Sequence, residues 1–167
     1  MTYPLFIVTG YSGSGKSTTS RVLGRLMPDF DVFDMDMIVH EQDFQTACNH
    51  WIRIAYSVAL CGRGTILFGP VPSPYNVAAC DRIRHFDPIH YLILNCSDEA
   101  RTRRLTERGG WTPAGIHHTN LAAAEMIRAA RHSVPPIPVV DTTNTPPQLA
   151  AEAIREWALA RWPGRLV

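Results

Sequence analysis

One stretch near the N-terminus constrains the fold of this chain more than any other. Residues 10–17 read Gly-Tyr-Ser-Gly-Ser-Gly-Lys-Ser, which matches G-x-x-x-x-G-K-[ST], the pattern of the phosphate-binding P-loop or Walker A motif. The apolar run at residues 5–8 predicts a buried strand, and the pattern of residues 17–27 predicts a helix. Because the motif lies between a predicted strand and a predicted helix, we refer to residues 10–17 as the P-loop.

The residue types of the P-loop suit a phosphate group. Glycines allow the backbone to wrap closely around an anion, and the N–H groups and the positive end of the following helix then face it. Lys16 is the only lysine among 16 lysine and arginine residues, and its compact charge can reach the β and γ phosphates. The Ser17 hydroxyl can ligate Mg²⁺. The alternative is a Gly/Ser-rich turn with Lys16 on the surface.

Composition and charge narrow the class of protein. A chain of 167 residues, 46% hydrophobic and 19% charged, suits one domain at 1–167 with a sizeable core. A net charge of +1 gives no electrostatic reason to expect nucleic acid or a membrane as the main partner. The four cysteines lack zinc-site spacing and are expected to be free thiols. With no signal peptide recognised, we expect a cytoplasmic protein, and its oligomeric state is left open.

The rest of the chain alternates short apolar runs with helical patterns, which predicts an α/β fold with a parallel sheet. Further strands are expected at residues 31–33, 65–68, 90–96 and 139–140. Further helices are expected at residues 45–61, 75–85, 98–108, 120–132 and from a capping box at 145–148 to about 161. Residues 70–74 and 111–115 are expected to be loops.

Two aspartates follow the predicted strand at 31–33. Asp34 and Asp36 are spaced i, i+2, so both are expected to point toward the mouth of the P-loop, because ligands of open α/β sheets bind off the carboxyl ends of the strands. A kinase needs one carboxylate to orient or deprotonate the acceptor hydroxyl, and another often orders Mg²⁺. The alternative is a solvated turn in which one aspartate caps the next segment.

Three arginines share one face of the predicted helix at 98–108. Arg101, Arg104 and Arg108 are spaced i, i+3, i+7 and lead into Gly109-Gly110. Beside a glycine hinge, they could close over ATP and neutralise charge on the transferred phosphoryl group. The alternative is an exposed basic face that pairs with the acids of the same helix, Asp98, Glu99 and Glu107.

Two familiar elements of other P-loop proteins are not found in the sequence. The predicted third strand ends in Phe68-Gly69-Pro70, without the Walker B acid of motors, helicases and transporter ATPases. An Asn-Lys-x-Asp element is excluded because Lys16 is the only lysine. A GTPase of the usual kind is therefore not expected.

Taken in order, the motifs GYSGSGKST, FDMD, ILFGPVPSP, HYLILNCSDEARTRRLTERGGW and VVDTTNTPP resemble the small P-loop kinases over nearly the whole chain. This nucleoside/nucleotide-kinase-like group includes shikimate, gluconate and adenylylsulfate kinases, and the chain is most similar to actinobacterial AAA-family ATPases or nucleoside kinases. The resemblance implies a three-layer P-loop NTPase fold: a five-stranded parallel sheet in the order 2-3-1-4-5, with helices on both faces and a short lid at about 109–118. It also implies ATP and Mg²⁺ as cofactors.

The resemblance also implies roles for individual residues. Asp36, Arg53, Gly69 and Arg108 would face the acceptor, with Arg53 as an anchor for an anion. Ser17 and Asp34 would hold the metal, and Lys16, Asp34, Asp36 and Arg104 would be the catalytic residues. The residues that would bind the nucleotide are Gly10, Ser12, Gly13, Ser14, Gly15, Lys16, Ser17, Thr18, Arg101, Arg104, Thr142 and Pro146, the last two from a loop expected to pack on the adenine.

The predicted activity is transfer of the γ-phosphoryl group of ATP to a hydroxyl of a small metabolite carrying at most one negative charge. The acceptor could be nucleoside-like, sugar-acid-like or an intermediate of specialised metabolism. One alternative is a nucleoside monophosphate kinase, which would need Arg53, Arg82 and Arg84 to converge on the acceptor phosphate. Another is a regulatory module that binds ATP without an acceptor, and a polynucleotide kinase is disfavoured by the weak net charge. Trp111 and the His117-His118 pair depart from the family pattern, and their roles stay open.

Overall fold

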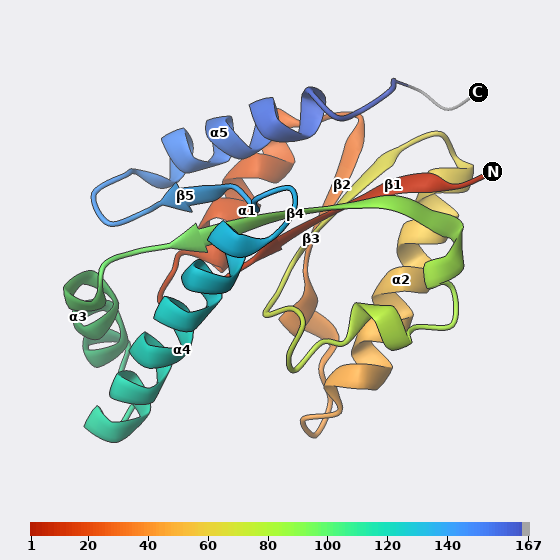
Figure 1. The fold of residues 1–167 in the computed structure, drawn as a ribbon. Coiled ribbons are helices and arrows are strands. Elements are labelled where there is room, and N and C mark those ends of the chain that lie inside the picture. Colours follow the sequence, from red (N-terminus) through yellow and green to blue (C-terminus); the bar gives the residue numbers. More distant parts are fainter. Residues whose placement is uncertain (165–167) are drawn as a thin grey trace.

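Five parallel strands form the central sheet of the computed structural model, which describes residues 1–164 (Figure 1). The strand order is β2-β3-β1-β4-β5, as the family resemblance implies. The pairing is parallel throughout, and Val8 of β1 lies in register with Phe68 of β3 and Leu92 of β4. The strands are β1 (Tyr3–Thr9), β2 (Phe30–Asp34), β3 (Gly64–Phe68), β4 (Phe86–Asn95) and β5 (Val139–Asp141).

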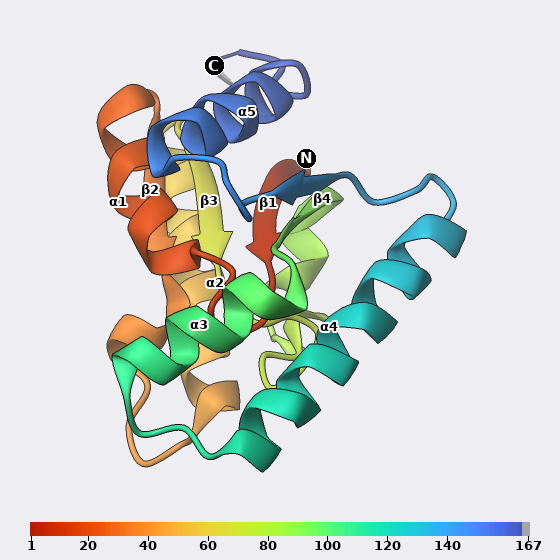
Figure 2. The same cartoon turned by 90° about the vertical axis from the view of Figure 1, so that its left-hand side faces the viewer.

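Helices cover both faces of this sheet (Figures 1 and 2). On one face, Phe6 and Val8 of β1 pack with residues of α1 (Lys16–Leu26) and α5 (Pro147–Leu159). On the other, Leu5 and Ile7 pack with α2 (Phe44–Leu60). A parallel strand that is covered on both sides is apolar at every position rather than at alternate ones. This accounts for the uninterrupted apolar run of β1.

The remaining two helices lie toward the carboxyl edge of the sheet. Helix α3 (Asp98–Arg108) begins after β4, and Ser97 caps it by accepting a hydrogen bond from the Ala100 N–H at 3.1 Å. Helix α4 (Pro113–His132) packs against α3 and runs back along the molecule toward β5 (Figures 1 and 2). Because all five strands are parallel, the P-loop, the segment after β2 and the loop after β5 meet at this one edge.

Two predicted elements near the edge are wrong in their extent. Helix α4 begins at Pro113 rather than at residue 120, because Thr112 caps it by accepting a hydrogen bond from the Gly115 N–H at 3.0 Å. Only residues 109–112 therefore separate α3 from α4. The capping box predicted at 145–148 is absent, since α5 starts one residue later, after Pro146, without a side-chain cap. Gln148 instead donates to Glu152 at 3.0 Å.

The helix predicted at residues 75–85 is also wrong. Two short 3-10 turns occupy this segment, η2 (Val77–Ala79) and η3 (Ile83–His85), and β4 starts at Phe86 rather than at residue 90. Gln45 of α2 binds both backbone groups of Asn76, at 3.1 and 3.3 Å. The Gln45 side chain thus satisfies backbone groups of Asn76 that a helix would otherwise pair within its own backbone. A further 3-10 turn, η1 (Met35–Ile38), follows β2, and no helix among residues 1–164 is long and apolar enough to cross a membrane.

Candidate active site

The P-loop connects β1 to α1, and its lysine folds back onto the loop. The Lys16 Nζ donates hydrogen bonds to the carbonyl oxygens of Gly10 at 2.6 Å and Tyr11 at 3.2 Å. Burial lowers the pKa of Lys16 from 10.5 to about 8, and the carboxylates of Asp36 and Asp34 oppose that shift. The ammonium group thus binds the loop, and the charges of the two nearby aspartates stabilise it.

Side chains from α3 and the loop after β5 hold the next carbonyls of the P-loop. Arg101 donates to Ser12 O at 2.9 Å, Arg104 to Gly13 O at 2.9 Å, and the Thr142 hydroxyl to Ser14 O at 2.8 Å. Every carbonyl from residue 10 to residue 14 therefore accepts a hydrogen bond from a side chain. With its oxygens held this way, the backbone of the loop is fixed without any ligand.

Arg101 is fully buried beneath the P-loop rather than open to the site. Besides Ser12, its guanidinium donates to the Asn95 Oδ1 at 2.7 Å and the Cys96 carbonyl at 3.5 Å, and burial lowers its pKa. Gly13 rests directly on it: a Cβ there would lie 3.1 Å from the Arg101 Cγ, and the φ of +82° also favours glycine. Arg101, expected among the nucleotide-binding residues, thus contacts the P-loop from beneath and supports it.

Arg104 and Arg108 line a groove between the P-loop and α5, which we call the α5-side groove. Arg104 also donates to the Thr142 carbonyl at 2.5 Å, which ties the loop after β5 to α3. Pro146 does not line this groove, and its neighbours Thr145 and Pro147 do. The groove measures about 260 Å³, and its lining is Gly13, Gly15, Thr18, Thr19, Arg104, Arg108, Thr142, Thr145, Pro147 and Ala150. Arg108, expected on the acceptor side, lies here.

Ser17 and Asp34 form a direct pair at the start of α1. The Ser17 hydroxyl donates to the Asp34 Oδ2 at 2.7 Å, and the Asp34 Oδ1 accepts from the Asp36 N–H at 3.1 Å. A hydroxyl and a carboxylate are hard oxygen ligands, and Mg²⁺ is commonly held by one or two protein groups together with phosphates and water. The donor set of Ser17 and Asp34 fits that ion, although within residues 1–164 no group of three or more His, Cys, Asp or Glu side chains could hold a metal.

Asp36 has a different partner, one that the sequence did not single out for this role. The hydroxyl of Tyr75 donates to the Asp36 Oδ1 at 2.6 Å. Tyr75 is fully buried, with Phe44 edge-on at 5.4 Å between ring centroids. Burial and the Asp36 hydrogen bond raise the pKa of Tyr75, so the phenol stays protonated as the donor. Nothing in the local sequence of Tyr75 marks it as a partner for Asp36.

Lys16 and Asp36 line one groove, which we call the Asp36 groove. It measures about 330 Å³. Trp111 from the α3–α4 connection and Thr119 from α4 also line it. The other lining residues come from the P-loop, α2 and the segment after β3: Tyr11, Ser12, Phe44, Pro70, Ser73 and Pro74.

Comparison with known proteins gives matches at the level of fold. No family model matches the chain, and no curated protein matches it in sequence. A sugar kinase from Janibacter sp. HTCC2649 has a TM-score of 0.60 at 20% identity, over 95% of each chain. The tunicamycin resistance protein of Deinococcus radiodurans gives 0.67 at 16% identity, over 95% of this chain and 96% of that one. A shikimate kinase from Acinetobacter baumannii, in complex with shikimate, gives 0.55 at 14%, over 96% and 95%.

The chain has the fold of the small P-loop kinases. Within this P-loop kinase fold, Arg53 does not line the Asp36 groove. Its exposed guanidinium binds the Asp81 carboxylate at 2.6 Å, and Arg53 lines a separate groove together with residues of α2 such as Ile54 and Ser57. The prediction of Arg53 as an anion anchor overlooked this carboxylate, which the path of the segment before β4 brings beside it.

The structure also shows the surroundings of Gly69, Arg82 and the histidine pair, which were singled out in the sequence. Gly69 is buried, and a Cβ there would lie 2.7 Å from the Met35 sulfur, so close packing on Met35 explains the glycine. Arg82 lies over the Tyr56 ring, 5.6 Å from its centroid. His117 and His118 are exposed near the start of α4.

Proposed function

We propose that this protein is an ATP- and Mg²⁺-dependent phosphotransferase that moves the γ-phosphoryl group to a hydroxyl of a small acceptor. The observation that carries the proposal is that the P-loop lysine and the Asp36 carboxylate line the same groove. A phosphate-binding cation and a carboxylate that accepts a proton are the two groups that this reaction needs close together. The sugar kinase and shikimate kinase among the similar structures support an acceptor of this general kind.

In this proposal, the nucleotide occupies the P-loop and the α5-side groove. The phosphates accept hydrogen bonds from the N–H groups of the loop, and Arg104 and Arg108 lie beside the groove that would take the base. Ser17 and Asp34 would hold Mg²⁺, which when bound neutralises charge on the transferred phosphoryl group. Residues 109–112, which include the exposed glycines 109 and 110, would be the hinge of the predicted lid at 109–118.

The acceptor hydroxyl would meet Asp36. Tyr75 binds the Oδ1 of this carboxylate, which leaves the Oδ2 to accept a hydrogen bond from the acceptor. The acceptor oxygen forms a bond to the γ phosphorus, its proton passes to Asp36, and the bond from the γ phosphorus to the leaving ADP oxygen breaks. Lys16 stabilises the charge that develops on the phosphoryl oxygens.

The nucleoside monophosphate kinase alternative has less support. Recognition of an acceptor phosphate calls for several arginines at the acceptor site. Arg53 is bound to Asp81 and Arg82 lies over Tyr56. Among the described residues, no arginine lines the Asp36 groove.

A screen of ATP turnover tests the proposal. Purified protein with ATP and Mg²⁺ is assayed for ADP release against a panel of hydroxylated compounds, and phosphorus NMR identifies the phosphate ester. Lys16→Ala should lower kcat by at least about 10²-fold, the effect of losing one transition-state contact of this kind. Arg103→Ala, on the exposed side of α3, is the matched control and should retain activity. Slow ATP hydrolysis that no acceptor accelerates would favour the regulatory module instead.

A further inference from the structure

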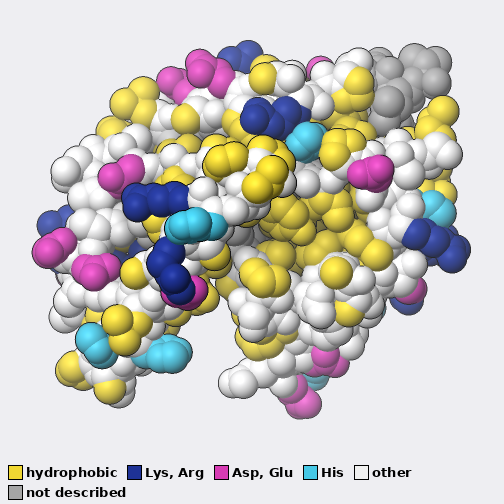
Figure 3. Space-filling view, in the orientation of Figure 1, with side chains coloured by type: hydrophobic (Ala, Val, Ile, Leu, Met, Phe, Trp, Pro, Cys, Tyr) yellow, Lys and Arg dark blue, Asp and Glu magenta, His cyan; other side chains and the backbone are white. Residues whose placement is uncertain are grey.

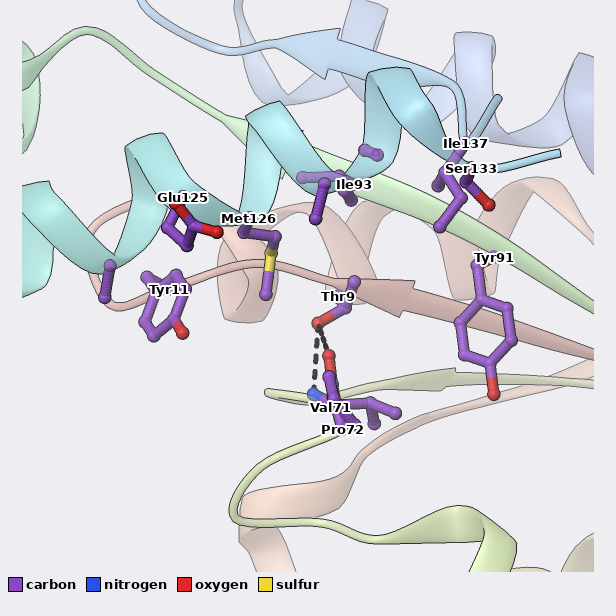
Figure 4. Close-up of a pocket in the computed structure, with 13 residues that line it drawn as sticks. Thr9, Tyr11, Val71, Pro72, Tyr91, Ile93, Glu125, Met126, Ser133 and Ile137 are labelled. Carbon is purple, nitrogen blue, oxygen red and sulfur yellow. Dashed lines mark hydrogen bonds between the residues drawn. The ribbon is translucent and has the colours of Figure 1, made fainter. Parts of the chain in front are cut away.

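A larger cavity adjoins the Asp36 groove, between α4 and the carboxyl ends of β1 and β4. We call it the α4 cavity; it measures about 570 Å³, within the usual size of small-molecule sites. Its walls are mainly apolar, with Val71, Pro72, Ile93, Met126 and Ile137 among them. Figure 4 shows Met126 of α4 pointing into the space between that helix and the end of β1. In Figure 3, hydrophobic side chains gather in the hollow beside α4.

Much of the polar lining of the α4 cavity is already satisfied by neighbours. The Thr9 hydroxyl donates to the Val71 carbonyl at 2.9 Å and accepts from the Val71 N–H at 3.0 Å (Figure 4). Glu125, the one charged residue of the described lining, is bound by Arg128 on the same helix at 2.6 Å. Only the hydroxyls of Tyr11, Tyr91 and Ser133 remain among the polar side chains of that lining. A ligand body in this cavity would therefore be neutral and largely apolar.

The α4 cavity lies next to the Asp36 groove. Tyr11 lines both. The segment after β3 lines both as well, with Val71 and Pro72 in the cavity and residues 70, 73 and 74 in the groove. Helix α4 contributes Thr119 to the groove and, one turn later, Ala122 to the cavity. One molecule could therefore reach from Asp36 into the space beneath α4.

We propose that the acceptor is amphipathic: it presents a hydroxyl to Asp36 and places a neutral, apolar body in the α4 cavity. This rests on the proposed function for the phosphorylation of that hydroxyl. It replaces the expectation of a polar acid anchored by Arg53, because Arg53 is bound elsewhere and the cavity offers no unpaired cation among its described lining. The cavity would then recognise the apolar part of the acceptor, and the Asp36 carboxylate would recognise its hydroxyl.

Phenylalkanols serve as the test probes. The series from phenylmethanol to 4-phenylbutanol is titrated by calorimetry in the presence of ADP and Mg²⁺, with polyols and hydroxy acids of matching size as polar counterparts. Affinity should rise roughly fourfold with each methylene that enters the cavity, and ADP release with ATP should rise in the same order. Polyols or hydroxy acids that bind as tightly as the phenylalkanols would overturn the inference.

Variants of α4 locate the binding. Ala122→Phe fills the cavity and should weaken 4-phenylbutanol at least about tenfold, with Ala129→Phe, at a more exposed lining position, as a second filling variant. Ala124→Phe, on the exposed side of the same helix and outside the lining, is the matched control and should bind normally. Unchanged affinity in a folded filling variant would contradict the proposal.

The two proposals fail in different ways. Lys16-dependent turnover of a polar acceptor, without binding of any phenylalkanol, overturns the apolar acceptor and leaves the kinase function standing. Binding of phenylalkanols in the α4 cavity, without turnover of any acceptor, overturns the kinase function and with it the assignment of the cavity to an acceptor.

Discussion

The two sides of the P-loop are built by different kinds of interaction. On the α5 side, hydrogen bonds from Arg104 and Thr142 hold the loop, and each needs a particular side chain at a particular place. On the α4 side, Tyr75 holds Asp36 by a hydrogen bond in the Asp36 groove, and the adjoining α4 cavity has mainly apolar walls that many residue combinations could supply. A hydrogen-bonded site is specified by few residues and leaves a motif in the sequence, whereas an apolar site of equal size does not.

The largest effect is expected on the catalytic rate, where substitutions of Asp36 and of Asp34 should differ. Asp36→Asn removes the proposed proton acceptor and should lower kcat roughly 10²- to 10⁴-fold at saturating Mg²⁺. Asp34→Asn, which changes the partner of Ser17, should mainly raise the Mg²⁺ concentration needed for half-maximal rate. Steady-state kinetics with a Mg²⁺ titration of each variant measures both. Identical profiles for the two variants would mean that the carboxylates do not divide the work between acceptor and nucleotide.

The second effect concerns stability on the hydrogen-bonded side. Arg101→Met keeps most of the buried volume but removes the hydrogen bonds to Ser12 and Asn95, so the free energy of unfolding should fall by roughly 2–4 kcal/mol. Urea denaturation followed by circular dichroism measures it. Arg103→Met, exposed on the same helix, is the control and should change stability by no more than about 0.5 kcal/mol. Equal effects of the two substitutions would show that Arg101 does not support the loop.

The smallest effect is a pH dependence of nucleotide binding. Burial lowers the pKa of Lys16 to about 8, so the ammonium form is lost as pH rises through that value. ATP affinity should therefore weaken roughly tenfold between about pH 7 and pH 9. Calorimetry at several pH values measures this, and Lys16→Arg, which keeps its charge, should remove the slope. A wild-type affinity that stays constant over the range would contradict the lowered pKa.

The same shift makes a prediction for stability without nucleotide. Unfolded Lys16 titrates near 10.5 and the folded side chain near about 8, so between these values the unfolded state binds more protons. The contribution of this group to the free energy of unfolding should therefore rise as pH increases through the window, and it is least favourable below about pH 8.

Two features near the P-loop can be read from the sequence. The P-loop follows from a contiguous motif, and the position of Asp34 and Asp36 follows from the parallel direction of β2. The strand order, implied by the family resemblance, is confirmed. The burial of Arg101 could not be predicted, because helical spacing gives the face on which a residue lies and not the depth at which that face is buried.

The α4 side was harder to predict because its contacts leave no motif in any one stretch of the chain. Asp81, the partner of Arg53, lies between the two 3-10 turns that occupy the segment where a helix was predicted at 75–85. Tyr75 reaches Asp36 across 39 positions of sequence. The cavity takes its lining from β1, β4, α4 and the segment after β3, and no single stretch of the chain carries its pattern.

The P-loop depends on more of the chain than the glycine-rich motif itself. The motif ends at residue 17, but the donors that fix its carbonyls include Arg101, Arg104 and Thr142, which lie 89, 91 and 128 positions away from their acceptors. A fragment that stopped before α3 would contain every letter of the motif and none of these three supports. In this protein, the geometry of the P-loop therefore depends on the whole fold, and the eight residues of the motif do not contain the side chains that fix it.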